Sequence, residues 1–544
     1  TGHVLSEDTL SAQAASLGDC MRCYRSMDLP GIDVLCNDRP FLTAKQASSV
    51  THQMGREGVT SELYGVTEWN CDFKTFKSQG DWQAALGVTA RVPHLSWMSM
   101  EGEAKRDWPG SIFYQSPYWK EFSYIEDYFA RLNTVLTRGE PAIDIAVLHP
   151  VESMWLHLGN QADTLQAGQE MDARFDALIQ GLLVRQKDFD LISESLLPSQ
   201  QPFCDRQGLH VGKMTYRTVI VPEMDTIRST TLEVLKQFHQ QGGQVIFVGK
   251  APHLIDAAPS EQVLVFQRQC TSVVSLSELC LLLDTGLSIC TENGSPADNL
   301  LCQRRLDGDV QWLFLCTSYP EKEKVDIPEK YHILIRSHFT VTAYDPQTGK
   351  TAPMFVQYDE EHTLIPWTAY AEDSLLIKLK AGESKIQPGK TTACIPYKTM
   401  LHPDAVTFSE PNMLLLDYAM AQLDGGQIGE KIEILRLDNM LRSQLGFKPR
   451  YGSMMQPYAM EEKETHQLTL YYEIFSETES PCVLALEHPE ICEILWNGNK
   501  ITLQDNGFYV DKSIREITLP CLRKGVNMLR LSLPYHQKTN LENL

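Results

Sequence analysis

The sequence has little positive charge, and this shortage limits the partners that it can bind. Its 48 Lys and Arg residues stand against 70 Asp and Glu residues, which gives a formal net charge of −22. A chain this acidic repels phosphate backbones and anionic lipid surfaces. The sequence also lacks any run of about 18 apolar residues, the length that spans a bilayer. We therefore expect neither nucleic acid nor a membrane as a partner.

Motifs for nucleotides and metals are also missing. Neither G-x-G-x-x-G nor the P-loop pattern occurs. The 14 cysteines are scattered, and only Cys20 and Cys23 have C-x-x-C spacing, without a second pair or a histidine cluster in register. We expect no metal site from this pattern. Scattered cysteines slightly favour a reducing, cytoplasmic compartment, but the localisation stays unknown.

The beginning of the chain lacks the features of a natural N-terminus. Thr1 is not an initiator Met, and no signal peptide follows it. We interpret the chain as the C-terminal part of a longer protein. Its 544 residues are too many for one core and predict about three or four domains.

Residues 1–140 alternate short strand patterns with amphipathic helical patterns. We expect parallel strands near 3–7, 31–35, 58–63 and 88–95. Such alternation predicts a parallel sheet covered by helices, and four strands make about half of an eight-stranded (α/β)₈ barrel. We therefore assign residues 1–140 to a partial catalytic barrel.

The rest of the chain divides into three further parts. Residues 141–290 read as a small doubly wound α/β domain, a structural part or an assembly surface that could make a homo-oligomer. From residue 291 the helical period disappears, and a β-sandwich is expected over 291–404. Residues 405–544 read as a second sandwich with a helical insert, in which Asn497–Gly498 forms a tight hairpin.

Two glutamates stand at the ends of predicted strands in the first domain. Functional residues in parallel sheets lie at the C-terminal ends of the strands. Glu7 and Glu62 would face the same rim there, and a glycosidase needs two carboxylates that face one pocket. The alternative stays open that each glutamate only caps a helix or pairs with an arginine.

Sugar-binding side chains are also frequent in this region. Aromatic rings suit the apolar faces of sugars, and histidine and acidic side chains suit their hydroxyls. Residues 101–110 mix charges and alone would equally fit a solvated loop. The aromatic stretch after them would equally fit a helix face that packs on the barrel. The candidate substrate-binding residues are His3, Asp33, Glu68, Trp69, His94, Trp97, Glu101, Trp108 and Trp119.

A resemblance to a known family rests on several segments. "TGHVLSED", "GDWQAALGV", "PHLSWMSMEGEAKRDWPGSIFYQSPYW" and "DIAVLHPVESMW" resemble large multidomain bacterial glycoside hydrolases, in particular the α-L-rhamnosidases of glycoside hydrolase family 106. The resemblance implies an (α/β)₈ barrel, a flavodoxin-like (amidotransferase-like) domain, a β-sandwich and a sugar-binding-like jelly roll. The second domain departs from an amidotransferase, because it lacks that enzyme's exposed cysteine and histidine.

The same resemblance implies hydrolysis of a glycosidic bond with inversion. Carried over, Glu7 is the acid and Glu62 the base. No organic cofactor is implied, and the family's calcium has no ligand set that we can match. An α-L-rhamnoside is the favoured substrate and a β-galactoside the second, although "HLSWMSM" departs from the family where sugar preference is set. The rival hypothesis is a non-catalytic carbohydrate-binding or assembly protein on the same scaffold.

Overall fold

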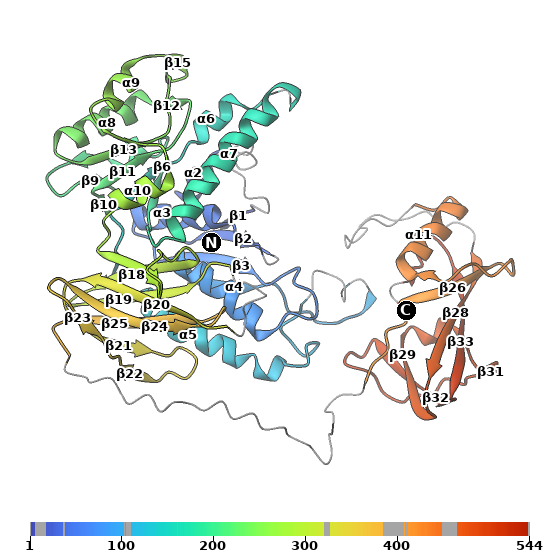
Figure 1. Cartoon of the computed structure of the whole chain (residues 1–544). Coiled ribbons are helices and arrows are strands. Elements are labelled where there is room, and N and C mark those ends of the chain that lie inside the picture. Colours follow the sequence, from blue (N-terminus) through green and yellow to red (C-terminus); the bar gives the residue numbers. More distant parts are fainter. Residues whose placement is uncertain are drawn as a thin grey trace. The chain divides into compact units, whose positions relative to one another are not determined.

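The computed structural model describes residues 2–5, 18–35, 38–102, 104, 110–159, 161–319, 327–384, 407, 412–448, 465–541 and 544. They belong to two compact units, which Figure 1 shows coloured along the chain. The first unit comprises residues 1–94 and 121–392, and the second comprises residues 95–120 and 393–544.

The first sheet of unit one contains four parallel strands in chain order. They are β1 (Gly2–Leu5), β2 (Pro30–Val34), β3 (Val59–Leu63) and β4 (Val88–Pro93). The helices between them are α2 (Cys20–Tyr24), α3 (Phe41–Met54) and α4 (Phe73–Ala85), and α5 (Ser123–Leu136) follows after β4 and the 95–120 segment. The prediction of four parallel strands in this region is confirmed.

The strand order decides where these helices lie. Each connection moves one strand in the same direction, and connections between parallel strands are almost always right-handed. Helices in such a sheet therefore fall on one face. Helix α3 packs on β2 and β3, and α4 packs on β4.

A second parallel sheet begins at residue 145. Its strands are β6 (Ile145–Leu148), β7 (Asp190–Ile192), β11 (Thr218–Val221), β13 (Gln244–Val248) and β16 (Thr271–Val273). They lie in the order β7-β6-β11-β13-β16, which is 2-1-3-4-5 and is the order found in flavodoxin. The apolar core of this region includes Val219, Val221 and Phe238.

Helices and short hairpins complete this second sheet. The helices are α6 (Val151–Leu156), α7 (Gln161–Leu183), α8 (Ser229–Gln240), α9 (Gln262–Gln267) and α10 (Leu276–Leu282). Two small sheets join β8 (Phe203–Cys204), β9 (Leu209–Val211) and β10 (Met214–Tyr216), and β12 (Thr226–Ile227), β14 (Leu254–Ile255) and β15 (Ala258–Pro259).

Helix α3 joins the two parallel sheets, because it also packs against β7. The side chain of Lys45 on α3 is 1% exposed, and its Nζ lies 2.8 Å from Asp188 Oδ1. His52 Nδ1, on the same helix, lies 2.8 Å from Asp190 Oδ1. Charges are tolerated inside a protein only when they are paired and hydrogen-bonded. These pairs explain how a helix with so many polar residues is buried on nearly all sides.

The last part of unit one is a sandwich of two antiparallel sheets. One contains β17 (Leu287–Thr291), β20 (Glu329–Arg336), β24 (His362–Ala369) and β23 (Gln357–Tyr358). The other contains β22 (Thr351–Pro353), β21 (Phe339–Tyr344), β25 (Ser374–Ala381), β19 (Val310–Thr317), β18 (Leu300–Asp307) and β5 (Glu140–Pro141). Alternate residues of the strands, such as Ile333 and Leu313, form the core between the sheets.

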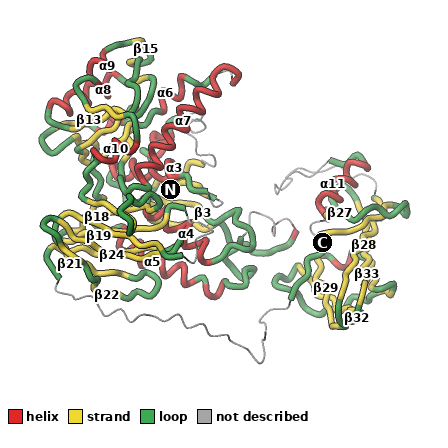
Figure 2. Tube along the Cα trace, in the orientation of Figure 1, coloured by secondary structure: helices red, strands yellow, loops and turns green. Residues whose placement is uncertain are grey.

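The described part of unit two consists mainly of strands with one long helix, as the secondary-structure colours of Figure 2 show. A six-stranded sheet contains β27 (Ile432–Glu433), β26 (Tyr418–Leu423), β28 (His466–Ser476), β33 (Gly525–Tyr535), β30 (Glu493–Trp496) and β31 (Asn499–Lys500). Strands β29 (Ser480–Glu487) and β32 (Ile514–Leu522) pair separately, and α11 (Ile434–Leu445) is the expected helical insert. Asn497 and Gly498 both have positive φ, which confirms the tight hairpin.

Candidate functional site

Glu62 lies next to the last residue of β3, on a strand whose burial alternates. Val59, Ser61 and Leu63 are buried, whereas Thr60 and Glu62 are half-buried. Successive side chains of a strand point to opposite faces of the sheet. In the register of the parallel sheet, Glu62 stands beside Asp33 of β2 and Val92 of β4. These three residues therefore share one face.

The contacts of Arg91, the residue before Val92, show which face of the sheet the helices cover. Its guanidinium lies 4.1 Å from the ring centre of Phe129 and 2.8 Å from the carboxylate of Glu126, both on α5. Arg91 thus points to the helix-covered face, and its neighbour Val92 points to the opposite one. The side chain of Val92 is 51% exposed. Glu62 and Asp33 therefore lie on the face that the connecting helices leave uncovered.

The turn after β3 has an unusual backbone. Tyr64, Val66 and Glu68 have φ values of 76°, 58° and 65°. A positive φ at a β-branched residue such as Val66 is a genuine outlier. Each such residue costs on the order of 1–3 kcal/mol, and such strain gathers at functional sites. Thr67 Oγ1 supports the turn by donating a 2.6 Å hydrogen bond to the Tyr64 carbonyl.

His94 lies against this strained turn. Its backbone N–H donates to the Leu63 carbonyl at 2.8 Å, so the pairing of β3 with β4 continues one residue past the strand. A Cβ at Gly65 would lie 2.7 Å from His94 Nδ1 and 3.0 Å from Leu35 Cδ2. Only glycine lets the imidazole approach this closely. Within the described ranges, the buried Nδ1 of His94 has no hydrogen-bond partner.

The predicted site residues fall into three groups. Asp33, Glu62, Glu68, Trp69 and His94 belong to unit one, where Asp33 is buried, Glu68 is exposed and Trp69 is 36% exposed. Trp97, Glu101 and Trp119 belong to unit two, in which Trp97 is 6% exposed and Trp119 38% exposed. Glu7, Trp108 and the side chain of His3 lie outside the described residues.

Several residues that shape this edge were not anticipated. The positive φ values of Tyr64, Val66 and Glu68 have no signal in the sequence, because each is a residue type that usually avoids that region. Gly65, which lies between them, was the one available hint of a special backbone.

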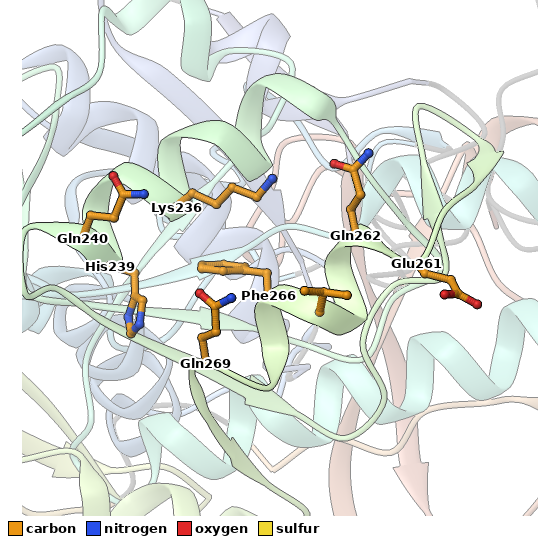
Figure 3. Close-up of a pocket in the computed structure, with 8 residues that line it drawn as sticks. Lys236, His239, Gln240, Glu261, Gln262, Phe266 and Gln269 are labelled. Carbon is orange, nitrogen blue, oxygen red and sulfur yellow. The ribbon is translucent and has the colours of Figure 1, made fainter.

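A cavity of about 420 Å³ lies elsewhere in unit one, between α8 and α9 (Figure 3). Lys236, His239 and Glu261 are among its lining residues, together with the core residue Phe266. Its described lining has a single carboxylate, that of Glu261, and no residue with positive φ. We therefore do not take this cavity as the candidate site.

Metal-ligand clusters and membrane-spanning helices are absent from the described residues. Within the described part of the chain, no three His, Cys, Asp or Glu side chains are grouped so as to hold a metal ion. The calcium implied by the family resemblance therefore has no ligand set there. Among the described helices, none is long and apolar enough to cross a bilayer.

Comparisons with known proteins give a structural likeness only. No protein-family model matches the sequence, and no curated protein matches it. The structure is similar to a rhamnosidase from Novosphingobium sp. PP1Y, with a TM-score of 0.51 and 15% identity over 96% of this chain and 48% of that chain. The chain thus spans about half the length of that rhamnosidase, with which it shares a glycoside hydrolase-like α/β and β fold.

Two weaker likenesses involve proteins of family GH42. An exo-carrageenase from Bacteroides ovatus has a TM-score of 0.45 and 10% identity, over 67% of this chain and 49% of that chain. A β-galactosidase from G. stearothermophilus has a TM-score of 0.44 and 12% identity, over 66% of this chain and 61% of that chain.

Proposed function

We propose that this chain is the C-terminal part of a glycoside hydrolase, in which Glu62 is a catalytic carboxylate. The observation that carries the proposal is the position of Glu62, at the C-terminal end of β3 and beside the buried Asp33, on the sheet face opposite the connecting helices. The strained turn and His94 directly behind it support a functional edge rather than a structural one. The fold likeness to a rhamnosidase supports the reaction class.

We further propose that the first sheet is half of an (α/β)₈ barrel. Parallel sheets bury both faces, yet the connections of β1 to β4 place helices on one face only. Curling of the sheet into a barrel would cover the other face, including Val92, and would turn Glu62 toward the rim. The proposed division of the remaining chain is a flavodoxin-like domain over 141–290, a β-sandwich over 291–404 and a jelly roll over 405–544.

In the proposed reaction, Glu62 acts as the general base. An ionised carboxylate at this position takes a proton from water as the water attacks the anomeric carbon, while an acid on the other side of the sugar protonates the leaving oxygen. Neighbouring parallel strands are about 4.8 Å apart, less than the roughly 6.5–9.5 Å that inverting enzymes leave between their carboxyls. Asp33 therefore suits a sugar hydroxyl, and Glu7 remains the proposed acid.

The finer proposal concerns the substrate. The name of the similar rhamnosidase and the family-106 segments both favour an α-L-rhamnoside. A β-galactoside is the second choice. A homo-oligomer formed through the flavodoxin-like domain stays a proposal as well.

The test replaces Glu62 with Gln in the full-length protein. The change keeps the shape and removes the charge, so kcat on an aryl glycoside should fall at least about 10²-fold with the fold intact. Glu68→Gln is the matched control, because Glu68 is an exposed carboxylate in the adjacent turn, and it should cost less. Near-wild-type turnover by Glu62→Gln would make Glu62 structural, and a wild-type protein without turnover would favour the non-catalytic rival.

A further inference from the structure

Residues 95–120 follow β4 and belong to unit two, and their described part, residues 95–102, 104 and 110–120, is here called the aromatic loop. The loop is folded on itself: Gln115 Nε2 donates to the Trp97 carbonyl at 2.9 Å. The rings of Phe113 and Trp119 meet edge to face with their centres 5.7 Å apart, and the two residues are 43% and 38% exposed. The loop thus presents a half-exposed aromatic pair, the type of surface on which sugar rings stack.

Asp511 of the C-terminal domain holds this loop. Asp511 is 3% exposed. Its Oδ2 accepts hydrogen bonds from the Tyr114 hydroxyl at 2.5 Å and from the Met100 amide at 2.7 Å. Its Oδ1 accepts from the Ser513 amide at 2.9 Å and hydroxyl at 2.8 Å. Ser99 Oγ of the loop also donates to Oδ1, at 3.4 Å. Oδ2 therefore accepts from the loop, and Oδ1 accepts from both the loop and Ser513.

A second carboxylate contacts the loop from the same end of the domain. Glu487 Oε2 accepts from the Gly102 amide at 3.1 Å, and Glu487 is 1% exposed. Glu487 stands opposite Ile514 in the pairing of β29 with β32, and Asp511 lies just before β32. The tip of this strand pair thus contacts the loop at two points.

The Asp511 carboxylate is ionised at neutral pH. Burial by itself raises its pKa, but hydrogen bonds from the Tyr114 hydroxyl, Ser513 and the Met100 amide outweigh burial and lower the pKa to about 2. Hydrogen bonds to an ionised acceptor are roughly twice as strong as neutral ones. Loss of the loop's three donors, Ser99, Met100 and Tyr114, would leave a buried charge only partly satisfied.

We propose that Asp511 is a positioning residue, which holds the aromatic loop so that Phe113 and Trp119 can receive a sugar ring. This inference rests on the proposed function, because the loop begins directly after His94. The ring of Tyr114 contacts that of Phe113, with the ring centres 5.1 Å apart. The hydrogen bond from Tyr114 to Asp511 therefore also positions the aromatic pair.

The experiment removes one hydroxyl from the full chain with Tyr114→Phe. Between the described parts of the loop the sequence has Lys105 and Arg106, after which trypsin cuts. Because a hydrogen bond to a charged group is lost, native-state cleavage there should become at least about 10-fold faster. With an aryl glycoside as substrate, KM should rise by about the same factor while kcat changes little. This is the result expected when an interaction that binds the substrate and the transition state equally is lost. Tyr124→Phe, at a ring that is 59% exposed on α5, should change neither quantity.

A double-mutant cycle with Asp511→Asn tests the pair itself. If Tyr114 acts through Asp511, the two changes together should speed cleavage no more than Asp511→Asn alone. The proposal would be overturned if the effects of the two changes on the cleavage rate multiplied independently. It would also be overturned if Tyr114→Phe were cleaved at the wild-type rate or had an unchanged KM. A wild-type protein that hydrolyses no glycoside would refute the proposed function instead, and the cleavage rates would still decide whether Asp511 holds the loop.

Discussion

Glu194 is a carboxyl buried two residues after β7, with 1% of the residue exposed. Burial raises its pKa from the ordinary value of 4.5 to about 7, although the Arg228 amide donates a 2.8 Å hydrogen bond to its Oε2. One pKa unit corresponds to about 1.4 kcal/mol. This carboxyl therefore opposes folding at neutral pH.

The prediction for Glu194 follows from proton linkage. Below about pH 4.5 the carboxyl is protonated in both states, and between about pH 4.5 and 7 only the unfolded chain loses the proton. The free energy of unfolding should fall through that window and stay lower above it, by about 3 kcal/mol. Glu194→Gln keeps an acceptor for Arg228, so it should stabilise the protein at pH 8 and not at pH 4.

Urea denaturation at the two pH values measures this effect. Glu233→Gln, at an exposed position of α8, is the control and should shift both values equally. An equal stability gain for Glu194→Gln at pH 4 and pH 8 would contradict the raised pKa.

At the scale of elements, the turn between β3 and α4 depends on Gly65. An added Cβ would lie 2.7 Å from His94 Nδ1 and 2.8 Å from His94 Cγ, so the imidazole would have to move. Gly65→Ala should reduce kcat/KM at least about 10-fold, because displacements of about 1 Å at a site can cost up to 10²-fold. Overpacking should also destabilise the protein by about 1–3 kcal/mol.

Gly168→Ala is the matched control for this prediction. Gly168 lies within α7, and its added Cβ would have only ordinary contacts, at 3.7 Å or more. That change should leave kcat/KM unaltered and stabilise the helix by about 0.5–1 kcal/mol. Equal kinetics for the two alanine variants would show that the fit of His94 against Gly65 has no role in the reaction.

At the scale of the whole molecule, α3 couples the two parallel sheets of unit one. Lys45→Met keeps the length of the side chain but leaves Asp188, and the fully buried Asp190 4.0 Å away, without this cation. Breaking one side of a buried pair costs about 3–5 kcal/mol. We expect a loss of that order in the free energy of unfolding of unit one, measured by denaturant titration.

Lys330→Met provides the comparison, because Lys330 also lies 2.8 Å from a carboxylate, that of Glu292, but with 58% of its side chain exposed. Exposed pairs contribute about 0–1 kcal/mol. Similar losses for both variants would mean that burial does not amplify the Lys45 pair.

The elements themselves were largely predictable. The alternating pattern of residues 1–140 predicted four parallel strands, and β1 to β4 pair in parallel. Asn497–Gly498 predicted a hairpin, and Glu62 was predicted at a strand end, where β3 carries it. Periods of 2 and 3.6 residues and turn preferences arise from neighbours in the chain, so they are visible in the sequence.

The environment of those elements was not predictable. Asp33 was assigned to the site, but its register with Glu62 depends on how β2 and β3 pair. Trp97 was expected to contact substrate, whereas it is buried within unit two, and that contact stays a prediction. The turn of Tyr64, Val66 and Glu68 adopts a backbone that those residue types avoid.

The sequence by itself determined the types and order of the elements and the end of β3 at which Glu62 lies, because local periodicity and turn chemistry decide them. Only the tertiary structure decided which face Glu62 shares with Asp33, why Lys45 can be buried and what holds the aromatic loop. Tyr114 and Asp511 are 397 residues apart in the chain. Contacts across such distances depend on how complete domains pack, and no local pattern records them.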